Sequence, residues 1–498
     1  MPRVPLLSGS RLVVASAPAD ARILRPPPPG RATDVAAATR EALRFPLQGP
    51  PLEELAARGA RVTIVVEPPA LPVGSVLGDP RPLAVAAVIE TLEGLGVPTE
   101  NQTLLVAGGL ARRASRREIA SLVTPELRRR FRGRLAVHDA ADPDLAGIPE
   151  GAPRARLARE LVETDLVVVV SAAETVLHGG PATLLAAADA ETQRRATSES
   201  LLVTGGSEGW RTATLVERTL AARVPLFGVS LVLNHPHFTG PLRGYPYELD
   251  AADRIARSPL RLAFAAAPEA VRRRVLRSLR GVRTVAAVLA GPPSVVHAEA
   301  LLRAIELRRA ILDEPLDALV IAIPGTTPFL PREKPNPLLA AHLGLGHALG
   351  LWRDAFPVAD GGVVILVHRF RRVFARPTQT PYHVFFRSDP IARDPALLAA
   401  AEDAVAADAR ALEDYRAGRT VHPQLPFRDW DSCRPALERL GAVYVAGARD
   451  AAAVRQLGFV PIGGVGAALQ MARGHRGPDA RIGFLLAPPY FPVVVGES

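Results

Sequence analysis

The sequence predicts an α/β protein whose sheets are parallel and covered by helices. Unbroken apolar runs, of which residues 166–170 are the clearest, are typical of strands buried on both faces of a sheet. These runs alternate with longer amphipathic stretches, and a repeated strand–loop–helix order indicates a parallel sheet. The 498 residues suffice for two or three domains of about 100–200 residues each.

The first predicted domain covers residues 51–300. Its predicted strands are 61–66, 103–107, 135–138, 166–170, 227–234 and 284–290, and its predicted helices include 82–95, 115–122 and 212–222. Gly96 follows the first of these helices and is suited to end it, because glycine readily adopts the left-handed conformation found there. Residues 235–283 interrupt the pattern with polar, proline-containing loops and an arginine-rich helix, so we expect an insertion.

Two further segments flank this domain. Residues 1–50 are rich in proline, including the run 26–29, and lack periodicity, so we expect an irregular arm. Residues 301–498 return to the alternating pattern, with strands predicted at 319–323 and 361–367. We therefore expect a second α/β domain over 301–498.

The net charge of +10 at pH 7 raises the question of a nucleic-acid partner. Arginine supplies nearly all of the positive charge, because Lys334 is the only lysine, and the arginine runs lie among acidic and aliphatic residues at helical spacing. Aromatic residues are not interleaved with them as in single-strand binders, so we expect no nucleic-acid partner. No apolar run reaches the roughly 18 residues of a membrane span. The single cysteine, Cys433, excludes an internal disulfide, so we expect a cytoplasmic protein.

Polar residues follow several predicted strands, at the sheet edge where α/β proteins bind ligands. In the first domain these residues are Glu67, Arg112, His138, Glu174 and His178. His178 is the strongest candidate, because it lies between a buried strand and a Gly-Gly turn; the alternative is a histidine that only packs this loop. Arg112 could bind a carboxylate through two parallel hydrogen bonds.

Two other motifs do not support a site. His235 and His237 occur in an Asn-His-Pro-His sequence, but no acidic or cysteine partner lies nearby at ligand spacing, so no metal site is predicted. Residues 204–209 form a glycine-rich turn before a helix. The lysine and hydroxyl residue of a P-loop do not follow it, so a structural turn is favoured.

Several short motifs occur in a characteristic order along the chain. They are 61–66 with a proline-rich turn, the 107–109 loop followed by Arg112, His138 with Asp139, 162–174, 290–297, 317–325, 360–367 and 458–461. Their joint order over about residues 61–492 resembles the lactate racemase family, the LarA-like proteins that use a nickel-pincer nucleotide. The resemblance implies two α/β domains with a site in the cleft between them, and racemase or epimerase activity on a small 2-hydroxy acid.

The resemblance also implies particular site residues. The family holds its cofactor covalently through a lysine, ligates nickel with a histidine, and moves the hydroxyl proton with two further histidines, whose ordinary pKa suits that task. By analogy, Lys334 and His342 face the cleft. The expected catalytic residues are His178, His342 and Lys334, and the expected substrate-binding residues are Glu67, Arg112, His138 and Glu174.

The chain departs from the family at most of these positions. The acid and the arginine of the family's first turn are replaced within residues 68–72, and only the neighbouring Glu67 could substitute. One proton-transfer histidine is replaced by Ala111 and the other by Val176. The Gly-Gly loop at 179–182 lacks the anchoring lysine.

The remaining departures concern the metal and the second domain. The nickel-ligand histidine aligns near residues 198–200, which contain none, and the family's glutamine and lysine align with Leu339 and His342. Lys334 is the only lysine and belongs to the other domain. We therefore expect that the nickel-pincer nucleotide is absent or is not held in the family's way.

Two functions remain open from the sequence. One is an enzyme of the lactate racemase superfamily whose site is remodelled around Glu67, Arg112, His178, Lys334 and His342. The other is a catalytically inactive relative that keeps the fold to bind a small molecule or a partner. In either case the expected ligand is a small carboxylate or hydroxy acid.

Overall fold

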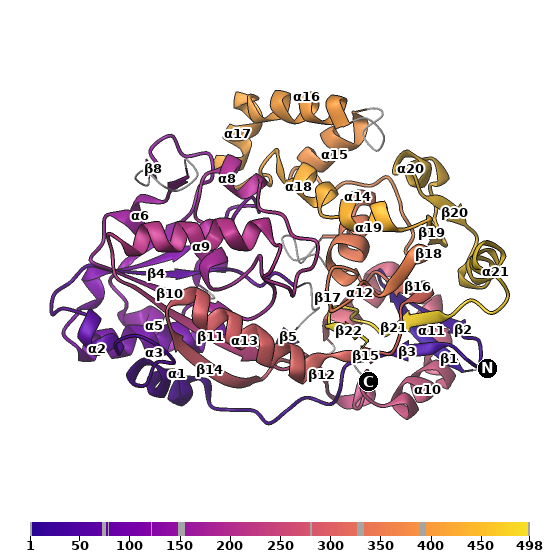
Figure 1. Cartoon of the computed structure of the whole chain (residues 1–498), viewed down its shortest axis with the longest axis horizontal. Coiled ribbons are helices and arrows are strands. Elements are labelled where there is room, and N and C mark those ends of the chain that lie inside the picture. Colours follow the sequence, from indigo (N-terminus) through magenta and orange to yellow (C-terminus); the bar gives the residue numbers. More distant parts are fainter. Residues whose placement is uncertain are drawn as a thin grey trace.

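The computed structural model describes residues 2–71, 76–77, 79–120, 122–147, 155–278, 281–325, 333–388 and 395–496. Within these residues, two six-stranded sheets lie in opposite halves of the molecule, and helices surround both (Figure 1). The predicted α/β class with parallel, helix-covered sheets is therefore confirmed.

The sheet of the first half has the strand order β14-β11-β10-β4-β6-β7. Its strands are β4 (Val62–Val66), β6 (Gln102–Val106), β7 (Arg134–Val137), β10 (Leu166–Ala172), β11 (Leu226–Leu233) and β14 (Val285–Gly291). Neighbouring strands are parallel, except that β14 runs antiparallel to β11. Every residue of the central strand β10 is buried, as its apolar run requires.

Helices cover both faces of this sheet. On one face, α1 (Val35–Arg44) and α3 (Arg81–Gly94) pack against the even-numbered residues of β4 and β10. On the other face, α7 (Pro181–Leu185) and α9 (Glu208–Ala221) pack against the odd-numbered residues. Because side chains alternate along a strand, the two faces bury two separate cores.

The other elements of this half are mostly short. They are α2 (Leu52–Leu55), β5 (Val76–Leu77), η1 (Thr99–Asn101), α4 (Arg116–Ala120), α5 (Pro125–Arg130), β8 (Ala146–Gly147), β9 (Arg156–Leu157), α6 (Arg159–Val162), α8 (Ala190–Arg194) and the long α13 (Pro293–Arg308). Helix α13 follows β14 and lies against β11. It leads the chain from the first sheet into the second half.

The second sheet has the strand order β20-β19-β18-β16-β21-β3, and all its neighbouring strands are parallel. Its strands are β16 (Leu316–Ala322), β18 (Val358–Val367), β19 (Ala442–Ala446), β20 (Val460–Ile462), β21 (Ile482–Leu485) and β3 (Arg22–Leu24). A small sheet joins β15 (Ala310–Leu312), β22 (Val493–Val495) and β17 (Trp352–Arg353). The helices of this half are α14 (Pro337–Ala341), η3 (His342–Ala348), α15 (Thr380–Arg387), α16 (Pro395–Ala406), α17 (Ala409–Arg416), α18 (Leu425–Asp431), α19 (Arg434–Arg439), α20 (Ala451–Gln456) and α21 (Val465–Arg476).

The expectation of an irregular arm over residues 1–50 is wrong for much of that segment. Strands β1 (Arg3–Ser8) and β2 (Arg11–Ser16) form an antiparallel hairpin, and β3 pairs with β21 at the edge of the second sheet. Short alternating apolar residues, among them Val4 and Leu6, pack into the core of the second half. These strands are short and lie beside prolines, which hid their pattern in the sequence.

The predicted insertion between β11 and β14 has a structure of its own. It contains β12 (His237–Phe238), η2 (Gly240–Leu242), α10 (Leu249–Arg257), α11 (Leu260–Ala266), α12 (Glu269–Ser278) and β13 (Gly281–Val282). Ala251 and Ala252 of α10 belong to the same buried cluster as Val4 and Leu6 of the hairpin. The insertion therefore leaves the first sheet and packs on the second half.

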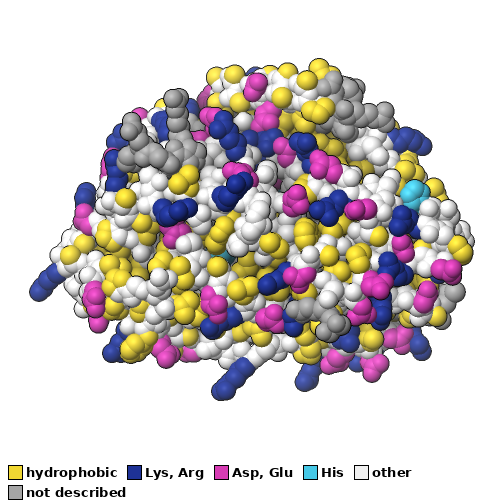
Figure 2. Space-filling view, in the orientation of Figure 1, with side chains coloured by type: hydrophobic (Ala, Val, Ile, Leu, Met, Phe, Trp, Pro, Cys, Tyr) yellow, Lys and Arg dark blue, Asp and Glu magenta, His cyan; other side chains and the backbone are white. Residues whose placement is uncertain are grey.

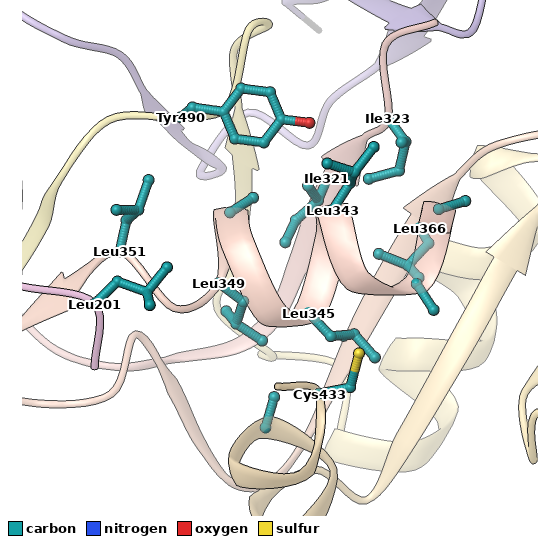
Figure 3. Packing of buried hydrophobic residues seen from close by; sticks show 14 of the residues in the cluster. Leu201, Ile321, Ile323, Leu343, Leu345, Leu349, Leu351, Leu366, Cys433 and Tyr490 are labelled. Atoms are coloured by element: carbon teal, nitrogen blue, oxygen red, sulfur yellow. The ribbon is translucent and has the colours of Figure 1, made fainter. Parts of the chain in front are cut away.

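Helix η3 is a π-helix at the centre of the largest core. Leu343, Leu345 and Leu349 point from it into a cluster that includes Ile321 and Leu366 of the second sheet (Figure 3). Leu201, from the first half of the chain, lies beside Leu351 in the same cluster (Figure 3). The π-helix is thus held from both halves of the molecule.

The surface carries both charges. On the face shown in Figure 2, basic and acidic side chains are interspersed and do not form a broad basic stripe. None of the helices in the described part of the chain is long and apolar enough to cross a membrane.

Candidate functional site

A cavity of 1210 Å³ lies between the two halves of the molecule. Glu67 and His178, which follow β4 and β10, line it from the first half, and Pro324 and His368, which follow β16 and β18, line it from the second. The carboxyl edges of the two parallel sheets therefore open on one cavity. This is the position where α/β folds bind their ligands.

Glu67 is buried at the wall of this cavity. Its carboxylate accepts hydrogen bonds from the Gly179 backbone N–H at 2.8 Å and from the Thr183 hydroxyl at 3.1 Å. Burial raises the pKa of Glu67 to about 7, and these two hydrogen bonds and the charge of Arg81 only partly oppose that rise. Glu67 can therefore gain or lose a proton near neutral pH.

Glu174 has protein partners on both of its carboxylate oxygens. It forms buried ion pairs with Arg81 at 3.0 Å and Arg283 at 3.1 Å, and it accepts a hydrogen bond from the Ala70 N–H at 2.7 Å. Burial acts to raise the pKa of Glu174, but the two guanidinium groups hold it below its ordinary value. Glu174 is not among the residues that line the cavity. It holds the loop after β4 against the loop after β10.

His178 lines the cavity and is partly exposed to it. Its Nδ1 lies 3.0 Å from the hydroxyl of Thr175, and its ring centroid lies 6.4 Å from that of His347. Burial, together with the nearby His347 and Arg428, lowers the pKa of His178 to about 3. The imidazole is therefore neutral at physiological pH and offers one donor and one acceptor.

The π-helix η3 contributes two more histidines to the cavity, His342 and His347. Their ring centroids lie 4.5 Å apart in an edge-to-face arrangement, and both rings are buried. Burial lowers the pKa of His342 to about 3 and that of His347 well below its ordinary value. Neither ring nitrogen of His347 has a partner among the described residues.

His342 is oriented by residues of α18 and the turn after it. Its Nδ1 lies 2.7 Å from the Ser432 hydroxyl, which itself donates to the backbone carbonyl of Asp429 at 2.7 Å. Ser432 must therefore accept from an Nδ1–H, which leaves the Nε2 lone pair of His342 3.7 Å from the Asp429 carboxylate. Tyr382 donates to the other oxygen of Asp429 at 2.5 Å, and burial raises the pKa of Asp429 to about 6.

Arg428 is the cation of this group. It is half-buried on α18 and lines the cavity, and no hydrogen bond or ion pair joins its guanidinium to any described residue. Its charge lowers the pKa of His178, His342 and His347, which line the same cavity. Burial lowers the pKa of Arg428 itself, although an arginine of this kind stays charged at pH 7.

The other predicted residues, Arg112, His138 and Lys334, each contact another group of the protein. Arg112 lines the cavity, but its guanidinium is paired with the Glu118 carboxylate at 2.7 and 2.8 Å. His138 lies away from the cavity, where its Nε2 is 2.7 Å from the Ala188 carbonyl and burial lowers its pKa to about 4. Lys334 lines the cavity and pairs with Glu269 of α12.

His347, Arg428 and Asp429 are site residues that sequence reasoning missed. His347 was visible as a second histidine in the helix of His342, but only π-helical geometry brings positions five apart together. Arg428 and Asp429 do not follow a strand, so the strand-end signal did not point to them.

The side chains present do not fit the covalent nickel-pincer cofactor of the family. A Cβ atom on Gly179 would lie 2.4 Å from the Cε1 atom of His297, so the Gly-Gly loop is packed closed where the anchoring lysine is expected. The only lysine, Lys334, is already paired with Glu269. Among the described residues, no group of three or more His, Cys, Asp or Glu side chains is arranged to hold a metal ion.

Comparison with known proteins gives a family model and two similar structures. Residues 10–178 match the model of the lactate racemase N-terminal domain. The chain resembles the lactate racemase apoprotein from Thermoanaerobacterium thermosaccharolyticum, with a TM-score of 0.62 and 15% identity over 99% of both chains. It also resembles a protein from Thermotoga maritima, with a TM-score of 0.50 and 12% identity over 94% of this chain and 100% of that one. At such identities the likeness of structure concerns the fold. None of the curated proteins compared with the chain matches it.

Proposed function

Because residues 10–178 match the model of the lactate racemase N-terminal domain, we propose that the cavity of this chain binds a small 2-hydroxy acid and interconverts its stereoisomers. The observation that carries the proposal is the guanidinium of Arg428, which has no partner among the described residues and lines the same cavity as Glu67 and three neutral histidines. A half-buried cation without a protein partner is suited to bind a carboxylate through two charge-assisted hydrogen bonds. The neutral histidines can then hydrogen-bond the hydroxyl group.

Glu67 is the proposed acid–base residue. Interconversion requires that the hydrogen on C2 leaves from one face and returns to the other. Glu67 can take this proton near neutral pH, because burial raises its pKa to about 7, and its protonated carboxyl group returns the proton once the planar intermediate has turned its other face toward Glu67. The electron pair left on the substrate would pass into its carboxylate, where Arg428 offsets the added charge.

We further propose that this chemistry proceeds without the nickel-pincer nucleotide. The support is the donor set: the loop at Gly179 and Gly180 carries no lysine, and Lys334 is engaged by Glu269. Hydride transfer through that cofactor is therefore not part of the proposal.

A second candidate is a relative that binds the same kind of acid without turnover. It is favoured by the low pKa of the histidines, about 3 for His178 and for His342, since such imidazoles are weak bases. In this case Arg428 still binds the carboxylate, and Glu67 serves only to hold the loop at Gly179.

One experiment separates the two candidates. The purified protein is incubated in D₂O with L-lactate, D-glycerate or D-mandelate, and deuterium at C2 is followed by NMR while chiral chromatography measures the other stereoisomer. Isomerase activity predicts both signals, and Glu67→Gln should abolish them. Binding measured by calorimetry without exchange would support the second candidate. Failure of every acid to bind would contradict both.

The carboxylate site has its own control. Arg428→Ala should weaken binding of the acid by about 10- to 100-fold, because a hydrogen-bonded charge pair is lost. Arg112→Ala should leave binding unchanged, since that guanidinium is occupied by Glu118. If Arg112→Ala weakens binding and Arg428→Ala does not, the carboxylate binds at Arg112 instead.

A further inference from the structure

Two arginines follow neighbouring strands of the second sheet, and a third begins a strand of the N-terminal hairpin that is attached to the end of β16. Arg369 follows β18 and Arg449 follows β19, and the Arg369 carbonyl accepts a hydrogen bond from the Arg449 N–H at 2.7 Å. Arg11 begins β2, just after the hairpin turn at Gly9. That turn is fixed on the end of β16 by a hydrogen bond of 2.7 Å from the Gly9 N–H to the Ile323 carbonyl. We call Arg11, Arg369 and Arg449 the arginine cluster.

The arginine cluster is not paired with an acidic side chain among the described residues. None of its guanidinium groups forms an ion pair or hydrogen bond within the part of the chain that the structure describes. The neighbouring acid, Glu269, is paired with Lys334 and lies 4.0 Å from Arg371. Burial and the nearby arginines lower the pKa of Arg369 to about 10, which shows how crowded the positive charge is. Crowded like charges destabilise a fold unless an anion relieves them.

The backbone holds Arg369 in place at a strained turn. The next residue, Phe370, is fully buried and has a φ of +35°, which is unfavourable for a side chain of its size. Its N–H donates to Nδ1 of His368 at 3.2 Å. Strain of this kind is kept mainly where a side chain must point in a defined direction. Here it fixes the turn from which Arg369 lines the cavity.

Several of the arginines that line the cavity differ in their surroundings. Arg428 lies among the histidines, and Arg11 and Arg369 lie at the end of the second sheet. The cavity volume of 1210 Å³ is also larger than the roughly 300–1,000 Å³ of a typical small-molecule site. A three-carbon acid does not need such a volume or a second cluster of cations.

We propose that the arginine cluster binds a phosphate group, and that the ligand is a phosphorylated 2-hydroxy acid whose carboxylate lies at Arg428. The proposal rests on the function proposed above for the same cavity. A phosphate monoester fits because guanidinium groups bind its oxygens through paired N–H donors, and two members of the cluster, Arg11 and Arg369, line the cavity.

The test compares D-glycerate with 3-phospho-D-glycerate, which differ by one phosphate group. Calorimetry on the full chain should show that the phosphorylated acid binds about 10- to 100-fold more tightly. Arg369→Gln should reduce that preference to less than about threefold while leaving the affinity for glycerate unchanged. The matched control is Arg372→Gln: Arg372 lies in the same loop, but its guanidinium already contacts Gln456 at 2.9 Å and Asp450 at 3.8 Å.

Other outcomes of these binding measurements distinguish a failure of the phosphate subsite from a failure of the proposed function. Equal affinity for the two acids, or a preference that survives Arg369→Gln, overturns the phosphate subsite and leaves the hydroxy-acid function standing. If neither acid binds but inorganic phosphate does, and Arg369→Gln weakens it, the phosphate subsite stands and the proposed function falls. If AMP binds and 3-phospho-D-glycerate does not, the subsite belongs to a nucleotide and the proposed ligand is wrong. Thermal melting of each variant verifies that it is folded.

Discussion

The imidazole rings of His342 and His347 lie edge to face with centroids 4.5 Å apart, although the two residues are five positions apart in the sequence. In an α-helix, residues three or four apart share a face. The π-helix η3 has wider turns, with hydrogen bonds from i to i+5, and so places this pair together. Single-turn π segments are common at functional sites. The pair forms the wall of the cavity opposite His178.

The first prediction concerns acid sensitivity. The folded chain holds the pKa of His347 well below the ordinary 6.5, so below that pH the unfolded chain binds a proton that the folded chain does not. Stability should therefore fall as pH drops from about 7 to 4. His347→Gln should lessen this slope, by at most about 1.4 kcal/mol per pH unit. Urea unfolding at pH 7 and pH 5 measures it. His475→Gln, on the exposed surface of α21, should leave the slope as it is.

The second prediction concerns Glu67, whose pKa is shifted in the opposite direction. A folded pKa of about 7, above the ordinary 4.5, means that the folded chain binds the extra proton between these values. Stability from this group is complete below pH 4.5 and is lost as pH rises through 7. Glu67→Gln cannot ionise, so its stability relative to that of the wild type should be greater at pH 8.5 than at pH 5.5. If the difference in melting temperature between the variant and the wild type is the same at both pH values, the raised pKa of Glu67 is contradicted.

The third prediction concerns the buried ion pairs of Glu174. Glu174→Gln leaves Arg81 and Arg283 buried without their counter-charge, which should lower the free energy of unfolding by about 3–5 kcal/mol. Glu163→Gln is the control, because Glu163 forms an exposed pair with Arg159. That pair should be worth about 0.5 kcal/mol or less. Urea unfolding at pH 7 compares the two variants, and similar losses would show that Glu174 is not a structural anchor.

The fourth prediction concerns Gly179. Its φ is +98°, and an added Cβ would lie 2.4 Å from His297 Cε1 and 2.6 Å from the Ala172 carbonyl oxygen. Gly206 has a similar φ of +79° but nothing within 4 Å of its Cβ position. Gly206→Ala should therefore cost only the backbone strain, about 1–2 kcal/mol, while Gly179→Ala should cost clearly more. Thermal unfolding measures the loss of stability in each variant. Equal losses would mean that the loop at Gly179 rearranges to accommodate the added Cβ atom.

The fold was accessible to sequence reasoning because its central strands are continuous apolar runs. The run at 166–170 lies within β10, and Glu67 and His178, which were selected because they follow predicted strands, line the cavity. Strand β3 was missed, since its partner β21 is far away in the sequence. A strand that completes a distant sheet carries little local signal.

The sequence predicted the candidate site only in part, again because contacts between distant segments determine it. Arg112 and Arg428 look alike in a sequence, and what separates them is whether the guanidinium already has a partner. Glu174 looks like a site residue because it follows a buried strand, yet Arg81 and Arg283 surround its carboxylate. Such differences arise from packing between remote segments.

The pairing of β3 with β21 has a consequence for synthesis of the chain. Leu24 lies opposite Leu485, so one edge strand of the second sheet is made early and its partner hundreds of residues later. A parallel contact over that separation closes late in folding, after a large entropic cost of loop closure. During translation the six strands of the first sheet can pair with one another, while β3 stays unpaired until β21 has been synthesised. The cavity with its histidines and arginines can therefore form only when nearly the whole polypeptide has been released.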